Sequence, residues 1–524
     1  MIKGAIAGRV DAGADRPHGW WESPWLLAAA VFLSAVPLLY PPIPPLVDLL
    51  GHMGRYRVQL DLGQSAWLRQ YYDFHWALIG NLGVDLLIVP LAPLLGLENA
   101  VKLVVVAIPP MTVAGFLWVA REVHGRIPPT AYFALPFALG HPFLFGFVNY
   151  ALSIALAFLA FGLWLRLGRL GKTRLRSWLF VPISLVVFFA HTYGWGVLGL
   201  LCFSAEAVRQ HDRGVGWVRS AWNAAWHSAV MALPLIIMLA WRSETHGGGT
   251  ADWFNFKAKF QWLTMALRDR WQTYDTVSMA AIVLVLAESL RNRRLTFSRN
   301  LAFSGLVLAV GFVLLPRIIF GSAYADMRLA PYMVAVLVLA VRFRGAISQR
   351  LGTALAVLGI AFLVIRVAST TASMAIASDD QQAKLKALDH IPMGARVISQ
   401  VGMPCTGLWD LPRNSHLGAM VVVRRDGYSN DQWTVEGANL LKLQYEKAGR
   451  FAADPSQIVR PNACPDRLRM GIDRSLATLP REDFDYLWLI DAPAHDPKLV
   501  DGLKPVWRGK GSILYRLDGG SANP

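Results

Sequence analysis

Long apolar stretches follow one another along the first 370 residues, and they constrain the fold more than any other feature. A helix needs about 20 mostly apolar residues to cross the hydrocarbon core of a bilayer. Twelve stretches approach that length: 24–40, 78–96, 101–120, 128–146, 149–165, 177–191, 194–208, 224–241, 275–290, 300–316, 328–341 and 351–370. The sequence therefore predicts a mainly α polytopic membrane protein whose first partner is the lipid bilayer.

The charge content agrees with this interpretation. Charged residues make up 16% of the chain, whereas soluble domains have about 25%. The net charge of +16 could suggest nucleic acid. However, much of the Lys and Arg lies in short loops between apolar stretches, where it sets membrane topology instead. We therefore expect no nucleic-acid partner.

The basic loops predict which side of the membrane each turn faces. Seventeen Lys and Arg but only two acids lie in five short loops, at 121–126, 166–176, 209–219, 291–299 and 342–350. The turns 141–149 and 191–195 contain no Lys or Arg. By the positive-inside rule the five loops are cytoplasmic and the two turns face outward.

This pattern fits a cytoplasmic N-terminus only if 78–96 does not cross completely. That stretch contains Asn81, Asp85, Pro90 and Pro93, which are typical of a re-entrant or interfacial segment. About eleven crossings then remain, and the C-terminus lies outside. The predicted organisation is a cytoplasmic tail (1–23), a transmembrane domain (24–370) with a long outer loop (41–100), and an extracytoplasmic domain (376–524). Composition is typical of a bacterial inner-membrane protein, which would make that last domain periplasmic.

The last 150 residues differ in kind from the rest. Short runs such as Arg396–Ser399, Ala419–Val423 and Tyr486–Ile490 suggest strands, and Gln381–Leu388 suggests a helix. We predict a small α/β domain. Cys405 and Cys464 both fall in it, and in an exported domain they either form a disulfide or remain free.

Polar residues gather on the predicted outer side. In the first outer loop, spacings of four and three residues place Asp48, His52 and Arg55 on one helical face. Further outer turns and loops add His141, Asn149, His191, Tyr193, Arg317, Tyr324, Asp326 and Arg328. Ionisable groups at membrane depth are costly unless they are paired or functional.

Each of these residues also has a structural interpretation. Asp48 and Arg55 could form an ion pair, Asp326 and Arg328 another, and the two histidines could donate to carbonyl oxygens at helix ends. Their common side favours function. A carboxylate beside cations at the membrane surface suits proton abstraction next to a phosphate leaving group.

On these residues the chain resembles the GT-C superfamily, polytopic glycosyltransferases that use polyprenyl-phosphate-linked sugars on the outer face. The likeness covers about residues 24–370. It rests on Pro44-Pro45-Leu46-Val47-Asp48 after the first helix, on the D-x-x-x-H-x-x-R spacing of Asp48, His52 and Arg55, on Lys102 and Arg121, and on Arg328-Leu329-Ala330-Pro331. It implies transfer of the sugar to a glycan, lipid or protein acceptor, with inversion.

The resemblance also implies residue roles. Asp48 would be the general base, helped by His52. Arg55, Arg317 and Arg328 would bind the donor and its phosphate, and His141, Asn149, His191, Tyr193, Tyr324 and Asp326 would line the substrate site. Many members have a paired acidic motif in the first loop, but Leu49 and Leu50 follow Asp48 here. We therefore expect no cofactor and no metal, although a divalent ion stays open.

Two other classes of function remain open. A transporter or flippase of lipid-linked saccharides would show internal repeats and midplane charges, whereas the sequence has no repeat and its polar groups lie at one boundary. A non-catalytic envelope assembly protein would depend on its exported domain. There Asp410, Arg413, His416, Arg424, Arg425 and Asp426 form a polar cluster that is either an acceptor-binding site or solvated surface. No G-x-S-x-G, H-E-x-x-H or Walker motif occurs.

Overall fold

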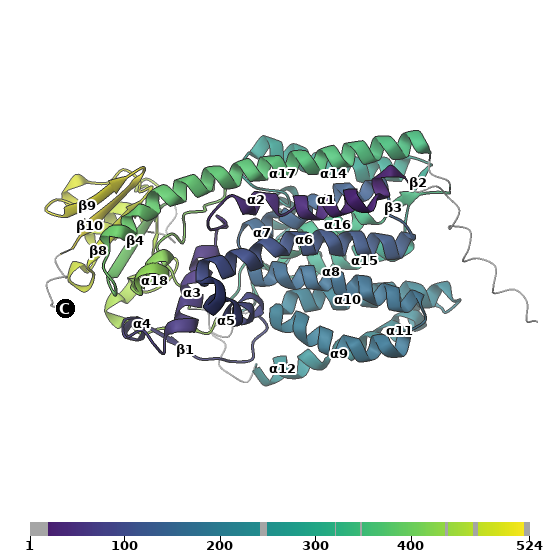
Figure 1. The fold of residues 1–524 in the computed structure, drawn as a ribbon, viewed down its shortest axis with the longest axis horizontal. Coiled ribbons are helices and arrows are strands. Elements are labelled where there is room, and N and C mark those ends of the chain that lie inside the picture. The colour runs from purple at the N-terminus through teal and green to yellow at the C-terminus, as the bar shows by residue number, and fades with distance from the viewer. Residues whose placement is uncertain are drawn as a thin grey trace, which may run out of the picture.

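The computed structural model describes residues 19–241, 249–319, 321–345, 348–434, 439–464 and 470–517. Most of the predicted tail, 1–18, lies outside these ranges. A bundle of long helices occupies one end of the molecule and a mixed sheet the other (Figure 1). The chain is thus mainly helical with a C-terminal α/β region, as the sequence predicts.

The helices of the bundle follow the apolar stretches, with some breaks. They are α1 (Pro24–Leu33), α2 (Val36–Leu39), α3 (Leu49–Asp61), α4 (Leu68–Tyr71), α5 (Gly83–Leu95), α6 (Leu97–His124), α7 (His141–Leu144), α8 (Val148–Arg169), α9 (Thr173–Ala190), α10 (Thr192–Asp212), α11 (Trp217–Ser228), α12 (Leu233–Trp241), α13 (Phe256–Thr264), α14 (Gln272–Arg291), α15 (Arg299–Leu314), α16 (Ala325–Leu339) and α17 (Gln349–Leu385).

Within the described residues, five helices are long and apolar enough to cross a bilayer: α6, α8, α9, α14 and α17. The segments Trp217–Met231 and Leu233–Ala240 form a sixth span if they count as one, although they meet at a bend of 64°. These are the helices of a multi-pass membrane protein. The expected number of about eleven crossings is not confirmed. Some expected spans form helices shorter than the bilayer requires, among them α15 and α16.

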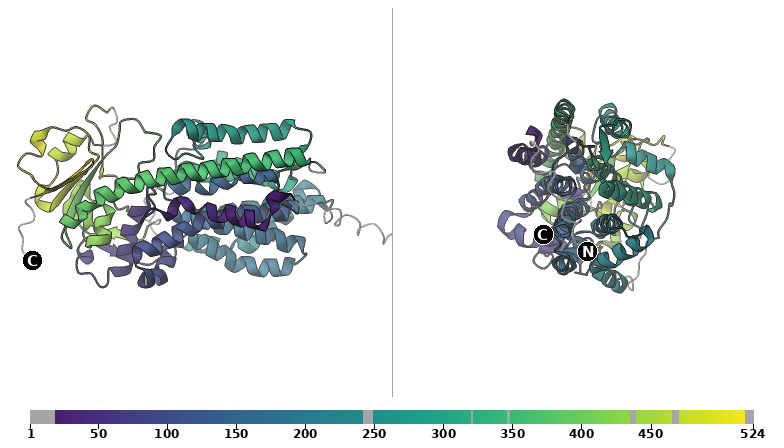
Figure 2. Two further views of the ribbon diagram at one scale, coloured as in Figure 1. Left: turned by 45° about the horizontal axis from the view of Figure 1, so that its top comes forward. Right: turned by 90° about the vertical axis from the view of Figure 1, so that its right-hand side faces the viewer.

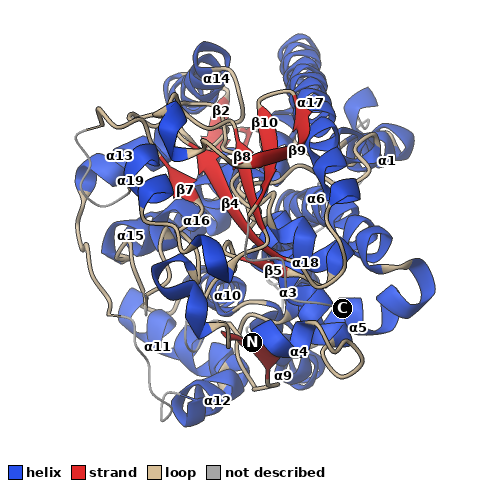
Figure 3. Ribbon diagram, turned by 90° about the vertical axis from the view of Figure 1, so that its left-hand side faces the viewer, coloured by secondary structure: helices blue, strands red, loops and turns tan. Residues whose placement is uncertain are grey.

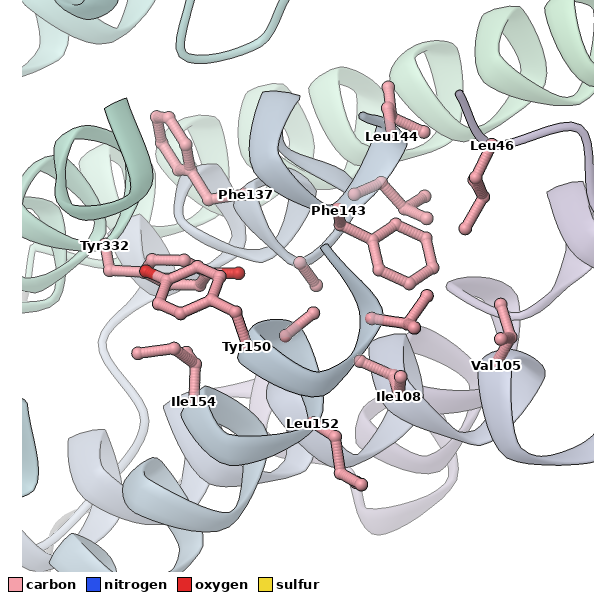
Figure 4. Packing of buried hydrophobic residues seen from close by; sticks show 14 of the residues in the cluster. Leu46, Val105, Ile108, Phe137, Phe143, Leu144, Tyr150, Leu152, Ile154 and Tyr332 are labelled. Carbon is pink, nitrogen blue, oxygen red and sulfur yellow. The ribbon is translucent and has the colours of Figure 1, made fainter. Parts of the chain in front are cut away.

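The expected span 128–146 is not a regular helix. It consists of the 3₁₀ helices Pro129–Phe133 and Leu135–Leu139, followed by α7. Prolines cause this, because each one removes a backbone donor and disfavours a helical residue before it. The segment is buried among its neighbours, as Figure 4 shows for Phe137 and Phe143 beside Tyr150 and Tyr332. Irregular backbone is tolerated at membrane depth only where protein covers it in this way.

The longest helix, α17, joins the two ends of the molecule. It has 37 residues, or about 55 Å at the rise of an α-helix, and it contains no proline. It runs along the bundle to the sheet (Figures 1 and 2). It therefore continues without a break beyond residue 370, where we expected the transmembrane domain to end.

The C-terminal domain contains a six-stranded mixed sheet. The order is β5-β4-β8-β10-β9, and β7 also pairs with β4. The strands are β4 (Arg396–Gly402), β5 (Tyr428–Ser429), β7 (Ile458–Val459), β8 (Tyr486–Ile490), β9 (Lys504–Gly509) and β10 (Ser512–Arg516), and the helices are α18 (Ala419–Arg425) and α19 (Ile472–Ala477). β4 is parallel to β5, β7 and β8, whereas β10 is antiparallel to β8 and β9.

Two of the three strands expected from short apolar runs are confirmed, β4 and β8. The prediction of a strand at the third run, Ala419–Val423, is wrong. This run lies in α18, the crossover between the parallel strands β4 and β5. Its β-branched valines suggest a strand. However, the run is buried on all sides between the sheet and α3, and a run that is apolar all round does not distinguish a strand from a buried helix.

The first outer loop is built into this domain. Its strand β1 (Tyr72–Phe74) pairs antiparallel with β6 (Leu441–Leu443). Ion pairs add to the junction: Arg413 to Asp269 at 2.6 Å, Arg424 to Glu98 at 2.8 Å and Arg57 to Asp426 at 2.9 Å. Much of the predicted polar cluster of the C-terminal domain therefore attaches that domain to the helices. At the opposite end of the bundle, β2 (Leu295–Phe297) and β3 (Val341–Phe343), which precede and follow the helices α15 and α16, form a separate antiparallel pair (Figure 1).

Candidate functional site

Asp48 lies at the junction of the bundle and the C-terminal domain, where it is the residue before α3. Its backbone amide donates to the carbonyl oxygen of Phe145 at 3.0 Å. Gly146 follows with a φ of +99°, and a Cβ there would lie 2.6 Å from the Asp48 nitrogen. The turn after α7 thus fixes the backbone of Asp48. The side chain makes no capping bond and is 13% exposed.

The C-terminal domain brings a histidine to this carboxylate. His416 Nε2 is 3.8 Å from Asp48 Oδ1. The other ring nitrogen, Nδ1, is 3.1 Å from the backbone oxygen of Asp431, and the ring packs on Trp433 with centroids 4.4 Å apart. The sequence drew attention to His416, but a separation of 368 positions hides its contact with Asp48.

His52 faces the same domain from one turn further along α3. Its ring lies 5.1 Å from that of Trp433 and stacks on Tyr56 at 6.3 Å. Burial, followed by the charges of Arg55 and His416, holds the pKa of His52 well below its usual value. His52 is therefore a neutral group within the interface that Asp48 borders.

Arg55 turns away from Asp48 and pairs with Asp85 on α5. The guanidinium and carboxylate are 2.8 Å apart, and both side chains are buried. The Asn149 amide donates to Asp85 Oδ2 at 2.8 Å, and its carbonyl oxygen accepts from the Val84 amide at 2.7 Å. The Asp48–Arg55 ion pair, the structural alternative for these two residues, does not form, and Arg55 and Asn149 instead form a polar cluster with Asp85. Asp85, an acid inside an apolar stretch, was the sequence signal for it.

Arg328 is the cation that acts on Asp48. It is 7% exposed, with its guanidinium 4.3 Å from the ring of Phe147 and 5.2 Å from that of Tyr193. Its hydrogen bonds go to Ser322 Oγ at 3.4 and 3.5 Å, and its Nε has no partner among the described residues. No described carboxylate lies within 4.0 Å of it, so the structural alternative of an ion pair with Asp326 does not form.

The electrostatics of Asp48 follow from these neighbours. Burial raises the pKa of the Asp48 carboxyl well above its usual value, and the nearby Asp454 raises it further. The charge of Arg328 opposes both effects. Asp48 is therefore a carboxyl group that takes up a proton more readily than an exposed aspartate. Asp454 carried no signal in the sequence, because it lies far along the chain in a loop of the C-terminal domain.

Arg317, Tyr324 and Asp326 form a neighbouring group before and at the start of α16. The guanidinium of Arg317 lies over the rings of Trp262 and Tyr324, at 5.7 and 5.5 Å, and 3.5 Å from Asp252. Asp326 is buried and pairs with Lys259 at 3.3 Å. Asp326 is thus already neutralised. Lys259 was missed, since the sequence gives no reason to expect a lysine from α13 inside the bundle.

His141 is the most isolated polar side chain near the site. It is 1% exposed, and neither ring nitrogen has a hydrogen-bond partner among the described residues. The ring lies between Phe145 at 5.9 Å and Trp262 at 6.2 Å, and the Trp262 indole nitrogen is likewise without a described partner. Buried donors and acceptors left unmade are costly, so this position suits a water or a hydroxyl-bearing ligand.

His191 instead caps the helix that follows it. Its Nδ1 accepts a hydrogen bond from the Tyr193 amide at 3.1 Å, and its ring lies 5.7 Å from Tyr150. The structural interpretation expected this histidine to donate to a carbonyl oxygen at a helix end. Its Nδ1 is instead an acceptor. Tyr193 lies beside Arg328, as noted above, so the turn that carries both residues borders the site.

The remaining candidate groups are the cysteines and possible metal ligands. Cys405 and Cys464 form a disulfide, and Cys202 is free and buried. No group of three His, Cys, Asp or Glu with metal-ligand geometry occurs in the part of the chain that the structure describes.

No family model matches the chain, and no curated protein matches it. Among solved structures, the chain is similar to ArnT from Cupriavidus metallidurans. The match to the apo structure has 13% identity and a TM-score of 0.45, and it covers 95% of this chain and 98% of that one. The structure of ArnT bound to undecaprenyl phosphate matches with 11% identity, a TM-score of 0.46 and the same coverage. Because both TM-scores are below 0.5, we base the function on the residues of the site.

Proposed function

We propose that this protein is a membrane glycosyltransferase of the GT-C type. It transfers a sugar from a polyprenyl-phosphate-linked donor to a glycan, lipid or protein acceptor on the outer face of the membrane. The observation that carries the proposal is a mostly buried carboxyl group, Asp48, under the influence of the charge of a buried arginine, Arg328, which has no carboxylate within 4.0 Å among the described residues.

The two groups suit the two ends of the reaction. Asp48 removes the proton from the acceptor hydroxyl as its oxygen bonds to the anomeric carbon. The bond from that carbon to the phosphate oxygen breaks, and the phosphate leaves with the electron pair, which inverts the configuration. The Arg328 guanidinium neutralises the leaving phosphate, for which its planar fork is well shaped. A raised pKa suits a general base, because its proton affinity then approaches that of a base working near neutral pH.

Nearby side chains serve binding. His141 and Trp262 leave ring nitrogens without hydrogen-bond partners among the described residues, next to aromatic rings, and this combination suits contact with a sugar. Arg317 is a second cation for the donor phosphate. Arg55 acts indirectly, since its pair with Asp85 anchors α3 and hence Asp48.

The disulfide supports the outer location of the site. Disulfides persist in oxidising compartments such as the periplasm, and Cys405 and Cys464 lie in the domain that contacts Asp48. Together with the basic loops predicted to be cytoplasmic, this supports a cytoplasmic N-terminus and a periplasmic C-terminal domain.

The direct test compares wild type with Asp48→Asn in nanodiscs. Each protein receives a panel of polyprenyl-phosphate sugars and a membrane glycan extract, and loss of the lipid-linked donor is measured. Undecaprenyl phosphate, which one of the ArnT structures contains, is the carrier to use first. We expect wild type to consume one donor and the variant to lose at least about 1,000-fold in rate, since general base catalysis contributes up to about 10⁴-fold.

Thermal unfolding serves as the folding check. A matched control is Asp61→Asn at the other end of α3, whose carboxylate makes a half-exposed pair with Arg57 and lies outside the site. A folded Asp48→Asn variant with wild-type activity would contradict the catalytic role. If wild type moves the intact lipid-linked sugar between leaflets without consuming it, the transporter alternative replaces the proposal.

A further inference from the structure

The contact between His416 and Asp48 goes beyond what the proposed reaction requires. His416 lies in the loop between β4 and α18, three residues before α18 begins, and it is 5% exposed. α18 packs on α3, and Figure 3 shows the two helices close together beneath the sheet. The histidine is therefore held by two parts of the chain that meet only at this junction.

Glycines on α3 permit this close approach. A Cβ on Gly51 would lie 2.5 Å from the Trp433 ring and 3.2 Å from His416 Nδ1. A Cβ on Gly54 would lie 2.5 Å from Gln432 Nε2. The face of α3 that precedes Arg55 thus fits the segment 431–433 and His416, and any larger residue at Gly51 would displace the imidazole from its position.

The partners of the ring determine its tautomer. Nδ1 lies 3.1 Å from the backbone oxygen of Asp431, and a carbonyl oxygen can only accept a hydrogen bond. Nδ1 must therefore carry the hydrogen. In a neutral imidazole the other nitrogen, Nε2, then has a free lone pair, and this is the nitrogen that lies 3.8 Å from Asp48 Oδ1. The ring presents a proton acceptor to the carboxyl group.

Burial, and not the surrounding charge, favours the neutral form of the His416 ring. Burial lowers the pKa of His416, while the charge of Asp454 and the hydrogen bond to Asp431 oppose that shift. The other titratable groups that face the pair are Asp431, whose pKa burial raises to about 7, His52 and Arg328. A proton that arrives on Asp48 therefore lies next to an imidazole nitrogen with a free lone pair, 3.8 Å from Oδ1.

We infer that His416 accepts the proton from Asp48 after each transfer, so that the C-terminal domain supplies a working part of the active site. The acceptor hydroxyl first gives its proton to Asp48 as the new glycosidic bond forms. The proton then moves from Asp48 Oδ1 to His416 Nε2, which regenerates the carboxylate and leaves an imidazolium that loses its extra proton to water. The gap of 3.8 Å closes by side-chain rotation, as distances in unliganded sites often shorten with substrate bound. This inference rests on the proposed glycosyl transfer.

One experiment tests the tautomer without any substrate. Protein labelled with ¹⁵N-histidine is studied by solid-state NMR in nanodiscs, and the His416 signals are assigned by their loss in His416→Gln. We expect hydrogen on Nδ1 and a bare Nε2, and Asp48→Asn should shift the Nε2 signal. Hydrogen on Nε2, or no response to Asp48→Asn, would overturn the inference whatever the protein catalyses.

A second experiment uses donor consumption. We expect His416→Ala to lower the rate by about 10- to 100-fold, with the KM for the donor unchanged, and added imidazole to restore part of the rate. His390→Ala, at an exposed histidine of the same domain, should match wild type. If His416→Ala is folded and as active as wild type while Asp48→Asn is inactive, this inference fails and the glycosyltransferase stands. If wild type consumes no donor in the panel but Asp48→Asn shifts the Nε2 signal, the proposed function fails and only the Asp48–His416 contact is retained.

Discussion

Asp48 and Arg55 both lie in the predicted first outer loop, and each belongs to an aspartate–arginine set. The two sets differ in how their charges are satisfied. Arg55 and Asp85 are in direct contact, and Asn149 completes the carboxylate's hydrogen bonds. Asp48 and Arg328 influence each other electrostatically without an ion pair. We call the first set complete because its opposite charges form an ion pair within the chain, and the second incomplete because no described carboxylate lies within 4.0 Å of Arg328. Each arginine leaves its Nε without a hydrogen-bond partner among the described residues, so the ion pair, and not an unmade hydrogen bond, is what distinguishes the structural set.

The largest expected effect comes from breaking the complete set. Replacing one member of a buried ion pair leaves the other charge uncompensated, which costs about 3–5 kcal/mol. Arg55→Met should therefore lower the free energy of unfolding by that amount, measured in detergent by denaturant or thermal unfolding. The double variant Arg55→Met with Asp85→Leu should recover most of the loss. If Arg55→Met is as stable as wild type but inactive, the pair is not structural and the comparison fails.

Breaking the incomplete set should reduce activity and spare stability. Arg328→Gln removes the charge that neutralises the phosphate, and we expect about a 100-fold loss in kcat/KM for the donor. This equals about 2.7 kcal/mol at 1.36 kcal/mol for each factor of ten. Unfolding should change little, because Arg328 has no ion pair to lose. The control is Arg317→Gln, whose half-exposed pair with Asp252 predicts a smaller loss. Equal losses of kcat/KM in the two variants would contradict a role for Arg328 that Arg317 does not share.

A change that adds volume tests the interface beside the incomplete set. Gly51→Ala places a methyl group 2.5 Å from Trp433, and overpacking of this kind costs about 1–3 kcal/mol. We expect a loss of activity larger than the loss of stability explains, since the ring of His416 must also move. Gly63→Ala, at a position on the same loop with open space around it, should be neutral in both measurements.

The smallest expected effect is a change in pH dependence. A general base works when deprotonated, so activity should fall as pH drops through the raised pKa of Asp48, at a pH above the ordinary aspartate value of about 3.9. Loss of the Arg328 charge removes an influence that lowers this pKa, so Arg328→Gln should move the acid limb to higher pH. The pH–rate profiles of wild type and variant decide this, and a limb that moves to lower pH would contradict it.

The stability of the folded protein should also depend on pH through Asp48, and the direction of that dependence follows from the direction of its pKa shift. A carboxyl whose pKa is raised on folding binds a proton more tightly in the folded state. Its ionisation therefore destabilises the protein as pH rises from the unfolded pKa to the folded one. Asp48→Asn removes this cost, so the variant should unfold at a slightly higher temperature than wild type at neutral pH.

The sequence predicted the helical class, the C-terminal α/β domain and strands β4 and β8, because these depend on local apolar patterns. It also placed Asp48 and Arg328 near each other, because the predicted topology puts both on the same side of the membrane. It could not predict that Arg55 pairs with Asp85 and not with Asp48. An arginine on α3 could reach either acid, and only the packing of the folded chain determines which one it contacts. His416 and Asp454 were equally hidden, since their contact with Asp48 depends on how a separate domain docks.

The pairing of Tyr72–Phe74 with Leu441–Leu443 also has a consequence for biosynthesis. Ribosomes deliver the chain from its N-terminus, so the Asp48 loop leaves the translocon long before its strand partner is made. Until residues 441–443 have been made, β1 has no partner, and until His416 has been made, Asp48 lacks that neighbour. On the proposed reaction, a nascent or truncated chain without the C-terminal domain would be inactive even when its helices are already in the membrane.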